Sequence, residues 1–290
     1  GSAGLYNRSL LLKPSPIKIR NIDAVISNFK EYCIIDERMS KRCAKDYKNT
    51  VKRFLIASNG IVSRECVRQY LRSYLSMRPS TYNNQLKGLR AFIKRYLRRP
   101  DIVYGLKKAY ETLNYDIKLP TLEQVRLGFF ELSDDRERAI YLFYASTGLR
   151  RSEVLHLVKD NIDFHLRAVK PNHFTRTKKS GITFYNEECE VHLNRYLATR
   201  EDNSNRVFRI PVEEFSLIWK KASRSAGFKI TPQVLRKWFS TELGERLIPD
   251  RFIDIFQGRA PRTVLAKHYT GKELLRLKRI YDKADLRILS

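Results

Sequence analysis

The chain has 290 residues, of which 42% are hydrophobic and 30% are charged. This length and balance predict a folded protein with room for two domains and exclude a disordered chain. Lys and Arg outnumber Asp and Glu by 57 to 31, which gives a net charge of +26 and predicts a polyanionic partner. Because the sequence has neither an apolar run of membrane-spanning length nor a basic amphipathic tail, we expect nucleic acid and no membrane.

The cysteines and the first residues bear on the compartment. None of the cysteines forms a C-x-x-C pair or a Cys/His zinc spacing, so we expect core thiols in a reducing cytoplasm. They are Cys33, Cys43, Cys66 and Cys189. Gly1-Ser2-Ala3-Gly4 is typical of a cloning remnant, and nothing nearby indicates a secretory signal.

Residues 5–118 are predicted to form one helical domain. Apolar periodicity places helices at about 22–36, 40–58, 63–76 and 80–98, with Asn21, Ser40 and Ser63 as N-caps. This part is also the more densely basic, because residues 1–119 hold 25 Lys and Arg against 9 Asp and Glu.

The last of these helices has a basic stripe beside its apolar one. The basic residues are Lys87, Arg90, Lys94 and Arg98. No Asp or Glu occurs between Glu65 and Asp101, although an exposed helix normally mixes both signs of charge. The alternative is an ordinary solvated face, but the absence of acids favours a surface that binds DNA phosphates.

A second domain is predicted over residues 119–290. Pro120 and the capping box of Thr121 with Gln124 mark its start. Helices are predicted at about 122–132, 135–146, 151–158, 187–199, 213–226, 232–245, 249–256 and 261–268. Short alternating segments over 162–186, with a turn at Lys179-Ser180-Gly181, predict a small sheet within this helical domain.

Two arginines in this domain follow helix-boundary signals. Arg150 lies just after Gly148, which is suited to end the preceding helix, and Glu153 follows one turn later. Arg236 lies one turn into a helix that Thr231 caps. Either arginine could have an ordinary surface or packing role, but a guanidinium also suits bidentate binding of a phosphate.

Tyr269 is the third candidate, and it ends a segment rich in basic residues. A phenol has an ordinary pKa near 10 and needs nearby cations to act as a nucleophile at neutral pH. With 16 tyrosines in the chain, its position after these arginines is what distinguishes it.

Together, Arg150 with Glu153, Gln233-x-x-Arg236, Gly258-Arg259 and Tyr269 resemble the ordered motifs of the tyrosine recombinases. The chain is most similar in these motifs to the integrases of archaeal viruses and plasmids. The resemblance covers residues 121–270, and the basic helical part is similar to the core-binding domain of the family. It implies a mainly α fold with a small antiparallel sheet, arranged as a C-shaped clamp around duplex DNA.

The resemblance also implies the roles of these residues. Arg150 and Arg236 would hold the scissile phosphate, and Tyr269 would form a 3′-phosphotyrosyl link and release a 5′-hydroxyl. A hairpin lysine would be the general acid, here Lys179 with Lys178 as the reserve. No metal, ATP or other cofactor is expected.

Two positions depart from the family pattern. Gln233 stands where His or Lys is common, and Arg259 stands where His or Trp is common. Neither an amide nor a guanidinium can accept a proton at neutral pH, so the general base is not identified. His268 is a supporting candidate, although neighbouring side chains on a helix point about 100° apart.

The predicted function is therefore site-specific recombination or integration of double-stranded DNA in the host cytoplasm. The resemblance implies assembly as a homo-tetramer on paired sites. One alternative is a type IB topoisomerase, which uses the same residue types on one duplex. Another is a non-catalytic DNA-binding protein with a decayed site, which Gln233 and Arg259 keep open.

Overall fold

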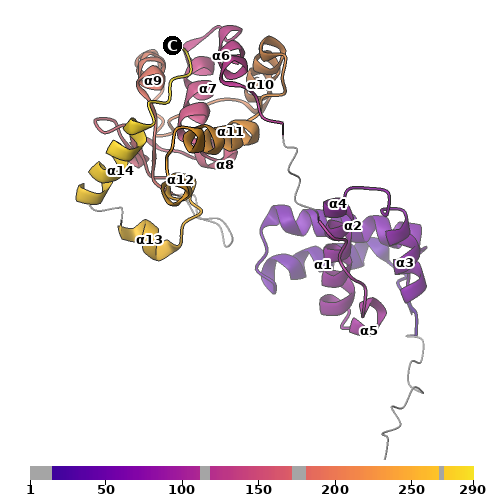
Figure 1. The fold of residues 1–290 in the computed structure, drawn as a ribbon. Helices are drawn as coiled ribbons and strands as arrows, with labels where there is room; N and C mark the ends of the chain where they lie inside the picture. The colour runs from indigo at the N-terminus through magenta and orange to yellow at the C-terminus, as the bar shows by residue number, and fades with distance from the viewer. Residues whose placement is uncertain (1–14, 112–117, 172–180, 268–270) are drawn as a thin grey trace, which may run out of the picture. The chain divides into compact units, whose positions relative to one another are not determined.

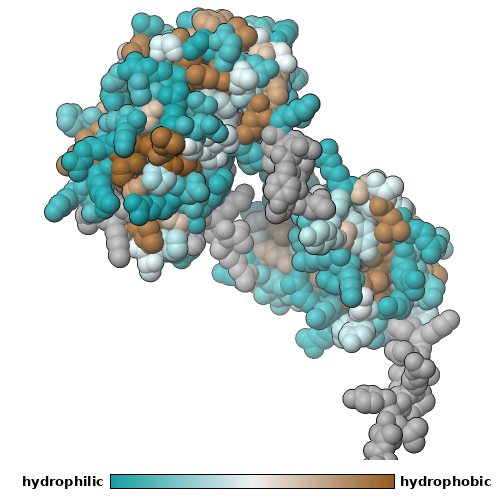
Figure 2. All heavy atoms as spheres, in the orientation of Figure 1, coloured by the Kyte–Doolittle hydropathy of each residue, from teal (hydrophilic) through white to brown (hydrophobic). Residues whose placement is uncertain are grey.

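The structure is a computed structural model that describes residues 15–111, 118–171, 181–267 and 271–290. The chain divides into two compact units, Gly1–Tyr115 and Asp116–Ser290, called here the N-terminal and C-terminal units (Figure 1). Each has its own hydrophobic core. The face drawn in Figure 2 is largely hydrophilic, with apolar residues in scattered groups. None of the described helices has the length and apolar character needed to cross a membrane.

The N-terminal unit is built from helices, as predicted. They are α1 (Ile22–Ile35), α2 (Lys41–Ala57), α3 (Arg64–Arg72), α4 (Pro79–Arg90) and α5 (Pro100–Val103). Asn21, Ser40 and Ser63 each accept a backbone N–H at the start of a helix, which confirms the three predicted caps. Phe29 and Phe92 meet edge to face in the core, with their ring centroids 5.2 Å apart.

Two predictions for this unit were wrong in detail. It is not helical throughout, because β1 (Ile17–Lys18) pairs antiparallel with β2 (Ile61–Val62). The helix predicted over 80–98 is also not continuous. α4 ends at Arg90 and passes into a π-helical turn over Ala91–Tyr96, after which Arg98 has a positive φ of 55°.

The C-terminal unit is mixed, as predicted. Its helices are α6 (Leu122–Phe130), α7 (Asp135–Thr147), α8 (Arg151–Leu155), α9 (Glu187–Ala198), α10 (Val212–Ala226), α11 (Pro232–Glu245), α12 (Asp250–Phe256), α13 (Arg262–Lys267) and α14 (Gly271–Lys283). A three-residue 3₁₀ turn covers Lys159–Asn161. The Thr121–Gln124 capping box before α6 is present. These findings confirm a mainly α protein with a small antiparallel sheet.

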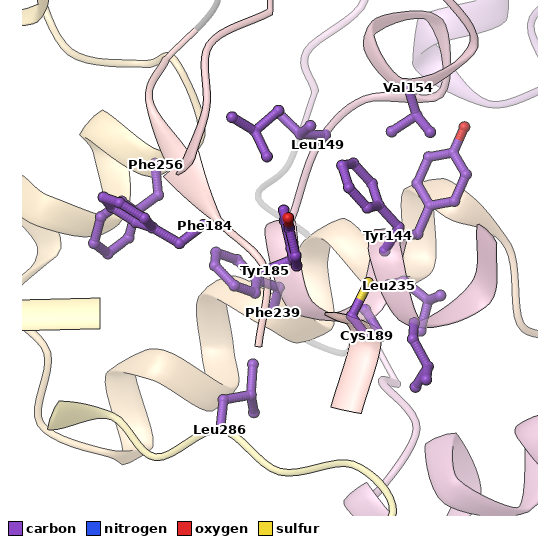
Figure 3. Close-up of a cluster of buried hydrophobic side chains, with 14 of the residues drawn as sticks. Tyr144, Leu149, Val154, Phe184, Tyr185, Cys189, Leu235, Phe239, Phe256 and Leu286 are labelled. Atoms are coloured by element: carbon purple, nitrogen blue, oxygen red, sulfur yellow. The ribbon is translucent and has the colours of Figure 1, made fainter. Parts of the chain in front are cut away.

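α7 is the central helix of this unit. Every residue from Ala139 to Thr147 is buried, which explains why its sequence is apolar on nearly all sides. α6, α9, α11 and the sheet all pack against it. Figure 3 shows Tyr144 of α7, Phe239 of α11, Phe256 of α12 and Phe184 of the sheet within one apolar cluster.

The sheet has three short antiparallel strands in the order β3–β4–β5. They are β3 (Ile162–Asp163), β4 (Ala168–Val169) and β5 (Thr183–Phe184). The Thr183 hydroxyl donates to the Thr147 carbonyl over 2.8 Å, which fixes β5 to the last residue of α7. Of the predicted turn, Gly181 is described, whereas Lys179 and Ser180 lie outside the described residues.

The C-terminal segment packs on the unit to which it belongs. Leu274, Leu277 and Tyr281 of α14 are buried in its core. The Tyr281 hydroxyl donates to the Ser146 carbonyl of α7 over 2.6 Å. α14 therefore contributes to the core of the C-terminal unit.

Candidate active site

Arg150 lies on the short turn between α7 and α8. Gly148 ends α7 with φ +64°, and an added Cβ there would lie 2.3 Å from the Phe239 ring. Only glycine fits this left-handed, crowded position. The chain therefore turns sharply, and Arg150 directly precedes α8.

Glu153 holds Arg150 in place. Its side chain is only 2% exposed, and one carboxylate oxygen accepts the Arg150 backbone N–H over 2.7 Å. The other oxygen accepts from Arg150 Nη1 over 3.0 Å. Because this carboxylate is buried, the pair is a fixed part of the turn and not a loose surface ion pair.

Arg236 reaches the same turn from α11. Its side chain is 4% exposed, and Nη1 donates to the Gly148 carbonyl over 2.7 Å. Nη2 donates to the Gln257 carbonyl over 2.6 Å. A guanidinium carries five N–H donors, so these two bonds position the group without exhausting its capacity to bind an anion.

The charged side chains of Arg150, Glu153 and Arg259 act on the guanidinium of Arg236. Burial, together with repulsion by Arg150 and Arg259, lowers the pKa of Arg236 from 12.5 to about 10, and the nearby Glu153 carboxylate opposes this shift. The guanidinium therefore stays charged at neutral pH. Since an arginine pKa falls where positive charge gathers in a poorly hydrated place, an anion bound there would relieve the repulsion.

The turn after α12 contacts both Arg236 and the segment that precedes β5. Gly258 has φ +66°, and an added Cβ at Gly181 would lie 1.9 Å from the Ile255 carbonyl oxygen and 2.6 Å from the Gly258 nitrogen. Gly181 thus lets the chain before β5 pack directly on this turn. The sequence predicted Gly181 only as part of a turn, and it did not predict Gln257 as a site residue. An amide directly after the apolar Ile255-Phe256 was the available signal.

The other predicted site residues differ in how much the structure describes. Gln233 is exposed, three positions before Arg236 in the first turn of α11, and Arg259 is exposed directly after Gly258. Lys178, Lys179, His268 and Tyr269 lie outside the described residues. Within the described ranges, no three His, Cys, Asp or Glu side chains come together as a metal-binding group.

In the N-terminal unit, the predicted basic stripe is only partly exposed to solvent. Lys87, Lys94 and Arg98 are exposed. Arg90 is half-buried, and its guanidinium donates to the Leu106 carbonyl. Arg90 thereby helps to hold the segment that follows α5 against α4, together with Asn83, which exchanges two hydrogen bonds with the Ala109 backbone.

The sequence is similar to known integrases and recombinases. The profile of the archaeal phage integrase family matches residues 117–284. The tyrosine recombinase XerA of Thermococcus onnurineus is 24% identical over 291 residues, which cover 91% of this chain and 96% of that protein. XerA of Pyrococcus furiosus is 27% identical over 286 residues, which cover 90% and 94%.

Solved structures share the fold. The Tn1549 transposon integrase in complex with transposon right end DNA matches with a TM-score of 0.63 and 16% identity, covering 88% of this chain and 98% of that one. A lambda integrase dimer bound to a core site matches with a TM-score of 0.63 and 13% identity, covering 83% and 96%. At this level of identity the likeness supports the fold.

Proposed function

The chain belongs to the archaeal phage integrase family and is a tyrosine recombinase, and from this premise we propose which residues carry out its chemistry. In our proposal Arg150 and Arg236 bind the two non-bridging oxygens of a scissile DNA phosphate. Tyr269 attacks the phosphorus, and the protein is joined to the 3′ end of the cut strand.

The observation that carries this proposal is the meeting of two arginines at one turn. Arg236 donates to the Gly148 carbonyl, two residues before Arg150, and Glu153 holds Arg150 through both its backbone and its side chain. Planar guanidiniums fixed in this way suit a phosphate better than flexible lysines would. Such preorganised donors stabilise the negative charge that develops in the transition state.

The proposed step is a transesterification at the phosphorus of the scissile phosphate. The Tyr269 phenol gives up its proton, for which His268 is the candidate acceptor. A bond forms between the phenol oxygen and phosphorus, and the bond from phosphorus to the 5′ oxygen breaks. The leaving oxygen takes a proton from Lys179, with Lys178 as the reserve donor. The phosphodiester becomes a phosphotyrosyl ester, so attack by a 5′-hydroxyl can reseal the strand without ATP.

Gln233 and Arg259 complete the proposed phosphate site. The exposed Gln233 shares the N-terminal part of α11 with Arg236, and its amide can donate to a phosphate oxygen. Arg259 lowers the pKa of Arg236 by repulsion, so it adds positive charge to the same place. We propose that both bind the phosphate and that neither acts as the base.

The proposed partner is double-stranded DNA, on which the chain would assemble as a tetramer at paired sites in the host cytoplasm. The net charge of +26 and the exposed Lys87, Lys94 and Arg98 support a DNA partner. The structural neighbours include a transposon integrase in complex with DNA and a lambda integrase bound to a core site. Family membership favours recombination over the relaxation of supercoils.

The decisive experiment is covalent trapping on a nicked suicide duplex that carries the chain's attachment site. The unmodified chain is expected to form a protein–DNA adduct, whereas Tyr269→Phe forms none because it lacks the phenol oxygen. Arg150→Ala is expected to bind the duplex at nearly the original affinity and to form no adduct. An adduct with Tyr269→Phe would refute the assignment of the nucleophile, and equal loss of binding in Arg150→Ala would reduce Arg150 to a binding contact.

A further inference from the structure

Gln257 is a buried amide at the end of α12. Its side chain is 1% exposed, although glutamine is mostly found at protein surfaces. It follows the buried Ile255 and Phe256 and precedes Gly258, which starts the turn towards Arg259. A polar side chain in such a place needs a specific reason.

The contacts of Gln257 lead to Arg236. Its Nε2 donates to the Arg236 carbonyl over 2.7 Å, and its own carbonyl accepts from Arg236 Nη2 over 2.6 Å. The two residues lie 21 positions apart, and the side chain of each donates to the backbone carbonyl of the other. A flipped amide would set two oxygens against each other, so the hydrogen bonding determines its orientation.

Stability alone does not account for this amide. Gln257 Oε1 is buried and has no hydrogen-bond partner among the described residues. An unpartnered buried acceptor costs more free energy than one neutral hydrogen bond returns, so an apolar side chain of similar length would be at least as stable here. A local cost of this kind is typical of a functional position.

We propose that Gln257 is a positioning residue that sets the guanidinium of Arg236 for phosphate binding, an inference that rests on the proposed function of Arg236. The carbonyls of Gly148 and Gln257 hold the two terminal nitrogens of that guanidinium. The Gln257 side chain fixes its own carbonyl by tying this turn to α11. Without the tie the peptide can rotate and the guanidinium can shift, and a misplacement of about 1 Å costs on the order of 100-fold in rate.

The first test is Gln257→Met, which keeps the length of the side chain and removes the amide. We expect single-turnover adduct formation at saturating suicide duplex to fall roughly 10- to 100-fold. The Kd for DNA is expected to stay within about twofold, because the charged groups remain. The Tm is expected to be unchanged or higher, which a merely structural role would not produce.

The matched control is Gln124→Met in α6 of the same unit. Gln124 also makes a side-chain bond to the backbone, since its Oε1 accepts from the Thr121 N–H over 3.0 Å. It is outside the proposed site, so adduct formation at the original rate is expected. An equal rate loss in both variants would overturn the proposal.

A second variant, Gln257→Glu, tests the bond itself. Its ionised carboxylate cannot donate to the Arg236 carbonyl, so we expect a similar defect at neutral pH. The protonated carboxyl can donate, so the rate relative to the unmodified chain is expected to recover as the pH falls. A ratio that does not change with pH would contradict the proposed contact.

A double-mutant cycle with Arg236→Lys shows whether Gln257 acts through Arg236. Residues that act as a unit give non-additive losses, so Gln257→Met is expected to add little in the Arg236→Lys background. Losses that simply multiply would overturn the proposal, as would unimpaired cleavage by Gln257→Met. If the unmodified chain itself forms no adduct, the proposed function fails. If the unmodified chain forms the adduct and Gln257→Met forms it at the same rate, only the proposed role of Gln257 fails.

Discussion

Gly148 gives a direct stability test at the scale of one residue. Gly148→Ala would place a Cβ at φ +64° and 2.3 Å from the Phe239 ring. A left-handed backbone costs about 1–2 kcal/mol for a non-glycine residue, and overpacking adds about 1–3 kcal/mol. We therefore expect the free energy of unfolding to fall by at least about 2 kcal/mol, measured by urea denaturation.

Gly227→Ala is the matched control for Gly148→Ala. Gly227 ends α10 with φ +61°, but nothing lies within 4 Å of its added Cβ. Only the backbone cost of about 1–2 kcal/mol should appear. If both variants lose the same free energy of unfolding, the close approach to the Phe239 ring does not contribute to the loss.

His268 tests the identity of the base. A histidine with an ordinary pKa near 6.5 would give a rate that rises through neutral pH as the imidazole loses its proton. If His268 takes the phenol proton, His268→Ala is expected to lose this limb of the pH–rate profile for adduct formation. An unchanged profile would remove His268 as the base.

The site residues that the sequence did not predict are those whose role depends on contacts between segments far apart in the chain. Arg150 and Arg236 carry strong local signals, a glycine cap and a capped helix start. For Gln257 the sequence offers only an amide that follows two apolar residues, because the partner that gives it a role is 21 positions away. Gly181 was predicted only as part of a turn, since nothing in its neighbours in sequence indicates that Ile255 packs against it.

At the scale of elements, Glu137 links the start of α7 to α10. Its carboxylate accepts from Lys221 Nζ over 2.7 Å and from the Ser133 N–H over 3.0 Å. Burial raises the pKa of Glu137, but Lys221 and the Ser133 N–H outweigh it, so the pKa lies below the ordinary 4.5. A carboxyl with a lowered folded pKa stabilises the fold above its unfolded pKa and loses that effect as the pH falls.

Glu137→Gln is therefore expected to lower stability at pH 7 and to flatten the acid side of the stability curve. The difference from the unmodified chain should shrink as the pH falls from about 4.5 through the lowered pKa. Urea denaturation at a series of pH values measures this difference in the free energy of unfolding. A constant difference over this range would show that the ionised carboxylate of Glu137 is not the cause.

Glu188 of α9 holds the end of the C-terminal segment. Its carboxylate accepts from the backbone N–H groups of Ile288, Leu289 and Ser290 over 2.7, 2.9 and 3.2 Å. Hydrogen bonds to a charged group contribute about 1.5–3 kcal/mol. We expect Glu188→Ala to lower the free energy of unfolding by about that amount.

The neighbouring Glu187 is the control for Glu188→Ala. Its side chain is 67% exposed and approaches Arg167 only to 3.8 Å. Exposed pairs of this kind contribute little, so Glu187→Ala is expected to change stability by less than about 0.5 kcal/mol. Equal effects of the two substitutions would mean that the three backbone bonds to Glu188 do not matter.

At the scale of the whole molecule, the surplus of positive charge predicts a steep salt dependence of DNA binding. Each phosphate contact contributes nearly one unit to the slope of log affinity against log salt. Lys87→Ala and Lys94→Ala are each expected to reduce that slope by about one, measured by fluorescence anisotropy. Unchanged slopes would place the DNA away from this stripe.

Arg90→Ala should behave differently from these two lysine variants. Arg90 is half-buried and donates to the Leu106 carbonyl, so its removal leaves that carbonyl without the contact. We expect Arg90→Ala to have a lower Tm than the unmodified chain. Its slope of log affinity against log salt is expected to change less than that of the two lysine variants. A full unit of slope lost without a change in Tm would return Arg90 to the DNA-binding surface.

The helical class, the position of most helices and the family can be predicted without the structure, because caps, apolar periodicity and the ordered motifs are local patterns. Asn21, Thr121 and Thr231 act as caps where the sequence predicted them. The two-residue strands β1 and β2 could not be predicted, since such short segments carry almost no periodicity and owe their pairing to contacts 43 and 45 residues apart.

The contacts that hold Arg236, in contrast, follow from the folded arrangement of distant segments. Its guanidinium contacts the Gly148 carbonyl, 88 positions away, and the Gln257 carbonyl, 21 positions away. Backbone carbonyls are present at every residue, so no sequence pattern distinguishes the two that accept. Packing of α7, α11 and α12 around one apolar core brings them together, and that is a property of the folded chain alone.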